Sequence, residues 1–182
     1  LHPAQTKFPH DTSITTTAKN ITNMQSDNLM AKASEFYKNK DFQKAAETYI
    51  SLTPATADSM IGAATSFEEL GEMDKALMYY QKAFELKPAD SDIAYYIASI
   101  YGEKEDFVNA KVYLQKSIAL NKNNTPAQEF LASIEESDRA NLLNDAISLY
   151  DENKMDESFA KFNELLTQDP QNSYALYYRG MI

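Results

Sequence analysis

Hydrophobic residues recur every three or four positions from about Ser26 to the end of the chain, a spacing that places them on one face of an α-helix. The first 25 residues lack this period. Their Thr12–Thr17 run is rich in β-branched residues, which form helices poorly. We therefore expect an irregular, Thr-rich leader over residues 1–25, followed by an all-α body.

Four segments of the body resemble one another, which indicates an internal repeat. Each has an acidic residue near its start, then a small residue, and then a bulky residue four positions further on. The small residues are separated by 31, 34 and 48 positions. The segments are Asp41–Pro54, Met73–Pro88, Asp106–Lys122 and Met155–Pro170, and their small residues are Ala45, Ala76, Ala110 and Ser158.

A second set of small residues lies between these segments, at spacings of 31, 34 and 34 positions. A small side chain lets the two helices of a hairpin approach closely, and a large ring fills the groove between them. The set consists of Ala33, Ala64, Ala98 and Ala132, and the first three are followed three positions later by Phe36, Phe67 and Tyr101.

With a period of 34 residues and these small and aromatic positions, the chain resembles the tetratricopeptide-repeat (TPR) family over roughly residues 26–182. The resemblance implies an all-α fold, a right-handed superhelical array of antiparallel helix pairs (a TPR solenoid, or α–α superhelix). The expected pairs are 26–39 with 41–53, 56–70 with 73–87, and 90–104 with 107–121.

The 48-residue spacing before Ser158 exceeds the repeat period by about four helical turns. The Thr-Pro-Ala-Gln sequence at residues 125–128 has the features of a helix start. No Gly or Pro follows until Pro170, which favours one long helix over residues 126–152. A break near Asp138, giving two ordinary helices, is the alternative.

These patterns divide the chain into four parts. The irregular leader covers 1–25, three repeats cover 26–124, and a long connecting or capping helix covers 125–153. Residues 154–182 hold the second helix of a fourth repeat and the first helix of a fifth. This last helix either caps the array or belongs to a repeat that continues beyond Ile182, and we expect the second.

The composition removes several classes of chemistry. The chain has 182 residues, no cysteine, and two histidines, His2 and His10, both in the leader. Disulfides, thiolate metal sites and thiol nucleophiles are excluded, and no helix carries a histidine-based metal motif. There is no glycine-rich phosphate loop and no calcium-loop pattern. We expect no catalytic residue, no metal and no cofactor, and therefore no enzyme.

A net charge of −10 without any basic run disfavours nucleic acid and anionic lipid surfaces as partners. The longest apolar stretch, Ile93–Tyr101, is too short to span a bilayer. The chain begins at Leu1 rather than at Met. We expect a soluble protein, cytoplasmic or extracytoplasmic after removal of a targeting segment.

In TPR proteins the first helix of each pair lines a concave groove that holds a segment of a partner. The resemblance therefore implies a set of groove-facing residues in this chain. Met30, Ile61 and Tyr95 lie three positions before Ala33, Ala64 and Ala98, and Ser34, Thr65 and Ser99 lie one position after them. Leu143 and Tyr177 are the counterparts later in the chain. Asp27, Asp58 and Asp92, near the expected helix starts, form an acidic rim.

This groove suits a protein or peptide segment that carries basic and apolar residues. Each feature also has a simpler interpretation. Acidic residues in a first helical turn complement the helix dipole, and Met and Tyr side chains pack between neighbouring repeats. The carboxylate clamp of chaperone-adaptor TPR proteins is absent, because the matching positions hold Met30, Ser34, Gly62, Asp92 and Tyr96.

Our leading hypothesis is a non-catalytic scaffold that binds a partner segment. The alternatives are a self-assembling structural protein and a secretion-type chaperone that holds an apolar client. The leader adds a possible internal partner: it carries a charge of +1 against −11 for the rest of the chain. We therefore also expect residues 1–24 to dock along their own array or that of a neighbouring copy.

Overall fold

The computed structural model describes residues 12–182, with side chains from residue 23 onward. The described part of the chain contains nine helices and no strand. They are α1 (Thr12–Lys38), α2 (Phe42–Ile50), α3 (Ala57–Glu69), α4 (Met73–Leu86), α5 (Ser91–Glu103), α6 (Phe107–Leu120), α7 (Thr125–Asp151), α8 (Met155–Gln168) and α9 (Ser173–Arg179).

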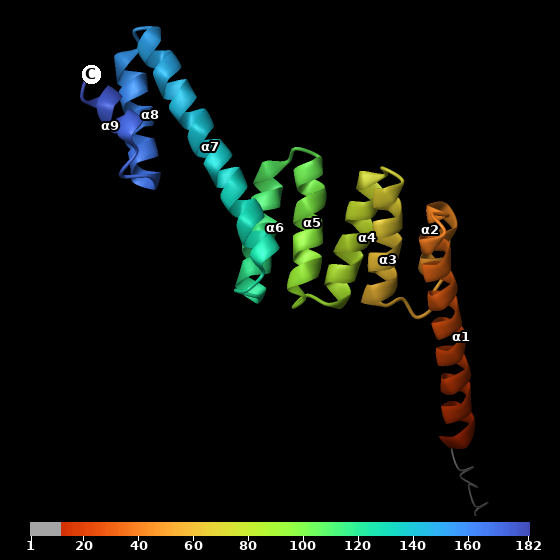
Figure 1. Cartoon of the computed structure of the whole chain (residues 1–182). Coiled ribbons are helices and arrows are strands. Elements are labelled where there is room, and N and C mark those ends of the chain that lie inside the picture. The colour runs from red at the N-terminus through yellow and green to blue at the C-terminus, as the bar shows by residue number, and fades with distance from the viewer. Residues whose placement is uncertain (1–11) are drawn as a thin grey trace, which may run out of the picture.

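Consecutive helices form antiparallel hairpins that stack side by side (Figure 1). The hairpins α3–α4 and α5–α6 form the middle of the stack. At one end α1 extends well beyond its partner α2, and at the other end α7 leads away from the stack to α8 and α9 (Figure 1). The predicted fold class, an all-α array of helix pairs, is confirmed.

Small residues make the closest helix contacts. The small residues of the four repeated segments have no exposed surface. Three of the four small residues in the helices between those segments are also fully buried. These buried residues are Ala33, Ala45, Ala64, Ala76, Ala98, Ala110 and Ser158. Because a larger side chain at any of them would force the helices apart, the small-residue period sets the distance between the two helices of each hairpin.

Stacked rings fill the space beside the alanines. Phe67 of α3 stacks on Tyr79 of α4 with ring centroids 5.5 Å apart. The same contact recurs one repeat later, between Tyr101 of α5 and Tyr113 of α6 at 5.7 Å. Two hairpins of the same length therefore pack with the same register.

The third repeat replaces the usual alanine by Ser117, which is fully buried. Its hydroxyl donates a 2.8 Å hydrogen bond to the Ser91 carbonyl and accepts one of 2.9 Å from Asn124 Nδ2. Asn124 also caps α7 by accepting from the Ala127 amide, so Asn124 and not Thr125 is the cap of this helix. The serine thus links α6 to the starts of α5 and α7.

The expected irregular leader is wrong for residues 12–25, which form the first half of α1. No Gly or Pro interrupts residues 12–38, so the helix that starts in the repeat continues backwards through the threonines. The propensity cost of each β-branched residue is below about 1 kcal/mol, too small to stop it. The rest of the leader, residues 1–11, lies outside the described residues, as do His2 and His10.

One unbroken helix, α7, occupies the segment for which one long helix or two short helices were considered. Its first half packs on α6 through Ala127, Phe130 and Ile134. The alignment of Ala132 with the buried alanines was wrong, because this face of α7 turns Ala132 outward and exposes it. Of the described helices, none has the combination of length and apolarity needed to cross a membrane.

The second half of α7 pairs with α8 around a separate cluster that contains Ala146, Phe162 and Leu165. The Ser158 hydroxyl donates a 2.8 Å hydrogen bond to the Ala146 carbonyl inside this cluster. A single helix therefore takes part in two packing units, one with α6 and one with α8.

Candidate functional site

Four of the predicted groove residues line one pocket of about 340 Å³. Ile61 and Thr65 come from α3, and Tyr95 and Ser99 come from the equivalent positions of α5. Residues four apart on a helix share a face, so each helix presents two of them to the same space. The sequence period and the pocket thus select the same side of the array.

The two small hydroxyls of this pocket turn back to their own helices. Thr65 Oγ1 donates to the Ile61 carbonyl at 2.8 Å, and Ser99 Oγ donates to the Tyr95 carbonyl at 3.2 Å. With their protons occupied in this way, Thr65 and Ser99 offer a ligand mainly apolar contact and acceptor oxygens.

Three further residues of the pocket were not among the predicted site residues: Glu68, Tyr80 and Tyr96. Glu68 lies seven positions after Ile61, and helical spacing alone was sufficient to find it. Tyr96 neighbours Tyr95 in the sequence. Tyr80 belongs to α4. As the bulky residue four positions after Ala76 it is expected to pack between helices, but the sequence does not indicate that its hydroxyl reaches the pocket.

The Tyr80 hydroxyl donates a 2.8 Å hydrogen bond to Glu68 Oε2 and lies 3.3 Å from Thr65 Oγ1. Partial burial raises the pKa of the Glu68 carboxyl above its ordinary value. The carboxylates of Glu103 and Glu69 raise this pKa further, while the bond from Tyr80 acts in the opposite direction. Glu68 is therefore a partly desolvated acid beside other acids.

The tyrosines of the pocket are in contact with one another. The ring of Tyr96 has its centroid 5.5 Å from that of Tyr80 and 6.1 Å from that of Tyr95. Burial raises the pKa of the Tyr96 hydroxyl, and the charges of Asp92 and Asp90 raise it as well. The pocket therefore combines three aromatic rings with a negative electrostatic environment.

The other predicted groove residues do not line this pocket. Met30 packs against the cluster around Ala33 and Tyr49, and Leu143 packs against the cluster around Ala146. The simpler interpretation, packing between helices, describes these two. Ser34 is half-buried, and Tyr177 of α9 is 61% exposed beside Tyr178.

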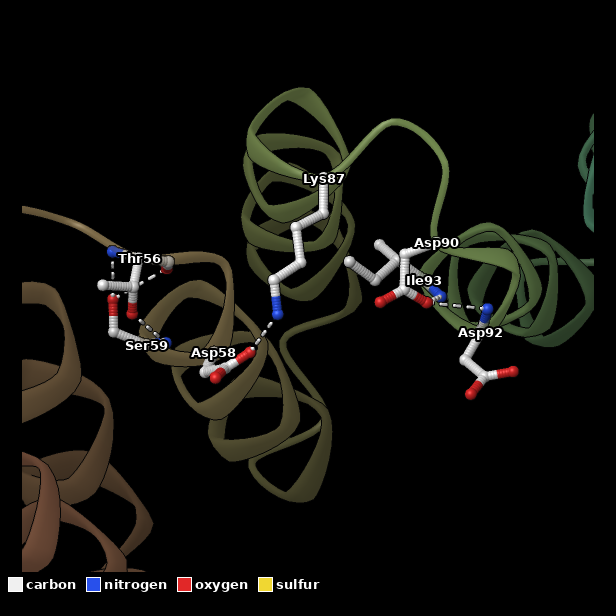
Figure 2. A network of polar contacts seen from close by, with 7 residues as sticks. All are labelled: Thr56, Asp58, Ser59, Lys87, Asp90, Asp92 and Ile93. Carbon is white, nitrogen blue, oxygen red and sulfur yellow. Dashed lines mark hydrogen bonds and ion pairs between the residues drawn. The ribbon is translucent and has the colours of Figure 1, made fainter. Parts of the chain in front are cut away.

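The acidic residues of the predicted rim differ in their surroundings. Asp58 in the first turn of α3 forms an ion pair of 2.8 Å with Lys87 (Figure 2). Asp92 lies in the first turn of α5, where Asp90 caps the helix by accepting from the amides of Asp92 and Ile93 (Figure 2). Asp27 is not at a helix start, because α1 begins at Thr12.

A sequence profile of the tetratricopeptide repeat matches residues 57–90 and 92–124. These matches cover the two hairpins whose buried alanines and stacked rings repeat in register. The chain is a tetratricopeptide-repeat protein. No sequence of a curated protein matches it.

Solved TPR structures share its fold. The second TPR domain of human RPAP3, in complex with the HSP70 peptide SGPTIEEVD, has a TM-score of 0.57 and 19% identity, over 63% of this chain and 98% of that one. The Yersinia enterocolitica type III secretion chaperone SycD, in complex with a peptide of the translocator YopD, has a TM-score of 0.58 and 16% identity, over 62% and 93%. The P58(IPK) TPR domain has a TM-score of 0.63 and 13% identity, over 96% of this chain and 49% of that one. At these identities the likeness establishes the fold alone.

A larger groove of about 880 Å³ lies where the regular TPR order is interrupted, between α6, α7 and α8. Val108 and Val112 of α6 border it and are 73% and 54% exposed. Its other wall carries charged residues, including Asp138, which pairs with Lys111 at 2.7 Å. Four of the eight predicted groove residues line the smaller pocket and none lines the larger groove, and we therefore treat the smaller pocket as the candidate site.

Among the described residues there is no group of three or more side chains placed to hold a metal ion.

Proposed function

We propose that this TPR protein is a non-catalytic scaffold that binds a segment of a partner protein along the inner face of its helix array. The observation that carries this proposal is the pocket lined by Ile61, Thr65, Tyr95 and Ser99. These residues occupy equivalent positions of successive repeats. The pocket spans two successive repeats, so a segment that runs along the array in an extended conformation would reach it.

The solved TPR neighbours support a peptide as the ligand, since RPAP3 and SycD are both in complex with peptides. The chemistry of the pocket favours a different peptide from SGPTIEEVD, which ends in acidic residues. The pocket contains Glu68 and no Lys or Arg side chain that would attract an acidic tail. The segment we propose carries basic and apolar residues.

The groups that face the pocket also suit contact better than catalysis. They are tyrosine and aliphatic hydroxyls and one carboxylate, and the carboxylate already accepts a hydrogen bond from Tyr80. Within the described part of the chain, no histidine or cysteine lines the pocket to activate a hydroxyl as a nucleophile. This arrangement supports binding without a chemical step.

The proposal is tested by selecting peptides from an unbiased random library on the purified chain and measuring their affinities by fluorescence anisotropy. Tyr95→Ala should weaken the selected peptides at least about tenfold, a typical cost for truncating an aromatic anchor. The matched control is Tyr174→Ala, which removes a 63% exposed tyrosine from α9. Tyr95→Leu, which keeps apolar volume, serves if the alanine variant unfolds. Equal binding by wild type and both Tyr95 variants would refute the pocket as the site.

Self-association is a second candidate because α6 exposes Phe107, Val108 and Val112 beside the larger groove. Contiguous exposed apolar side chains of this kind mark contact surfaces. Light scattering over a range of concentrations tests this candidate. If it is right, the mass rises with concentration and Val112→Lys abolishes the rise. A constant monomer mass would eliminate it.

A further inference from the structure

The pocket between α3, α4 and α5 has an electrostatic imbalance that its own residues do not correct. Within the described part of the chain, Glu68 forms no ion pair, although it is half-buried. The charges that act most strongly on it are those of Glu103 and Glu69, which are also carboxylates. A partly buried charge without a counter-ion is unfavourable, and a ligand cation relieves it.

The hydrogen bond from Tyr80 does not supply the missing charge. It is a neutral donor that fixes Glu68 Oε2 at 2.8 Å and orients the carboxylate. Burial raises the pKa of the Tyr80 hydroxyl, and the adjacent Glu68 also raises it, so Tyr80 remains a protonated donor. The second carboxylate oxygen is left for a ligand.

The aromatic rings add an attraction for the same kind of ligand. Tyr80, Tyr95 and Tyr96 form a connected set, with centroid separations of 5.5 Å and 6.1 Å. Ring faces attract cations through their quadrupole, and the attraction is stronger where water is excluded. Elsewhere in this protein lysines already lie over rings, as Lys116 does at 4.5 Å from the centroid of Phe84. No lysine is placed over Tyr80, Tyr95 or Tyr96 in the described residues.

We propose that this pocket receives the side-chain cation of a lysine or arginine of the bound segment, with Glu68 as its counter-ion and Tyr95 and Tyr96 as its aromatic walls. The inference rests on the proposed function, which it makes specific at one position of the ligand. An apolar side chain in the same place would displace water from Glu68 without supplying a hydrogen bond or a charge in its place. An acidic side chain would be repelled by Glu68 and by the nearby charges of Glu103 and Glu69.

The Asp90 and Asp92 carboxylates extend the negative region beyond the pocket. Both raise the pKa of the Tyr96 hydroxyl, which shows that their field reaches the pocket wall. Asp58, by contrast, is paired with Lys87. Asp90 and Asp92 form no ion pair among the described residues, so their charges add to the negative environment of the pocket.

The test uses the selected peptides that depend on Tyr95. Each lysine or arginine of such a peptide is replaced by norleucine or citrulline, which are uncharged and similar in length. The affinities are measured with wild-type protein, Glu68→Gln and Glu85→Gln. Glu85→Gln is the matched control, because it removes the same charge from an exposed position of α4 outside the pocket.

We expect one basic residue in each peptide whose neutralisation weakens binding to the wild type about tenfold, as for a hydrogen bond between charged groups. This loss should disappear in Glu68→Gln and persist in Glu85→Gln, which is the coupling that a double-mutant cycle detects. Tyr96→Leu should weaken the charged peptide about threefold and leave its neutral counterpart unchanged.

Two results overturn the inference and leave the proposed function intact. One is a set of Tyr95-dependent peptides without lysine or arginine. The other is a neutralisation loss that is equal in wild type and Glu68→Gln. If no selected peptide depends on Tyr95, the proposed function itself fails and the inference falls with it.

Discussion

The Tyr80 hydroxyl donates a 2.8 Å hydrogen bond to Glu68 Oε2, so a residue of the second helix of one TPR hairpin holds the only carboxylate of the pocket in place. Tyr80 is 3% exposed and Glu68 is half-buried. The contact joins the core of the hairpin to its inner surface. A charge that does not help the fold is thus kept in a fixed position, which is typical of groups selected for binding.

Glu68→Gln should therefore raise the stability of the free protein. The pKa of Glu68 is raised, which means that its ionised form is less favourable in the folded chain than in the unfolded one. The amide keeps an acceptor for Tyr80 and removes the charge. We expect a gain below about 1 kcal/mol because water screens part of the carboxylate, and a rise in the thermal midpoint of about 2 °C.

Differential scanning calorimetry of wild type, Glu68→Gln and Glu85→Gln at neutral pH measures this effect. The two variants have the same net charge, so their difference isolates the pocket. A lower midpoint for Glu68→Gln than for Glu85→Gln would contradict the prediction.

The affinity for a lysine-containing peptide should depend on pH through Glu68. Above its raised pKa the carboxyl is ionised and pairs with the lysine, and as the pH falls through that pKa this attraction is lost. Glu69 and Glu103 also act on Glu68, and Tyr80 stays protonated throughout. We expect affinity to fall as the pH is lowered through this raised pKa, because lysine remains fully charged there.

The stability of the free chain should change in the opposite direction over the same range. A raised folded-state pKa means that the folded chain binds this proton more tightly, so the contribution of Glu68 to stability increases as the pH falls toward 4.5. Glu68→Gln removes both dependences. Anisotropy titrations across the pH range test the binding part, and a pH-independent difference between wild type and Glu68→Gln would refute it.

Gly62 and Gly102 form a matched pair of positions at which the tightness of helix packing can be tested. A Cβ on Gly62 would lie 2.6 Å from Cζ of Tyr49, whose ring is 9% exposed and enclosed by its cluster. A Cβ on Gly102 would lie 2.5 Å from Cζ of Phe130, which is only half-buried and has room to move.

We expect Gly62→Ala to lower the free energy of unfolding by about 1–2 kcal/mol through overpacking. Gly102→Ala should be neutral or stabilising by up to about 1 kcal/mol, because Ala favours helix more than Gly. Urea unfolding followed by circular dichroism gives both values. Equal losses at the two positions would show that Phe130 is held as firmly as Tyr49.

The orientation of the C-terminal hairpin should depend on the middle of α7. Residues 135–141 include no buried side chain, and among the described residues the one ion pair that links this stretch to α6 is between Lys111 and Asp138. Asp138→Gly with Ala140→Gly should loosen the connection, because Ala140→Gly costs about 1 kcal/mol of helix propensity and Asp138→Gly removes the ion pair with Lys111. We expect a larger radius of gyration by small-angle X-ray scattering and nearly unchanged helicity.

The control for this experiment is Ala119→Gly, at an exposed position near the end of α6. It should leave the scattering curve unchanged. A curve that is equally unchanged in the double-glycine variant would show that the groove contacts between α6, α7 and α8 hold the two packing units together.

The repeat was readable from the sequence because its small residues are required by geometry. Ala64, Ala76, Ala98 and Ala110 are fully buried, and the boundaries of α3, α4, α5 and α6 agree with the expected ranges to within one residue at either end. The two errors have different origins: local propensity suggested an irregular segment for residues 12–17, and the 34-residue spacing was extended into α7 for Ala132. The threonines of residues 12–17 form a helix because the rest of α1 continues through them, and Ala132 faces outward because Ala127, Phe130 and Ile134 set the packed face of α7.

The amino-acid sequence by itself determined which helices pair and which face of α3 and α5 turns inward, because helical spacing follows directly from residue order. Only the tertiary structure decided which of the predicted groove residues share a pocket, and it added Tyr80 from a neighbouring helix. It also decided that Glu68 is half-buried among carboxylates while Asp58 is paired with Lys87. Burial and pairing depend on distances between residues far apart in the chain, which no local pattern contains.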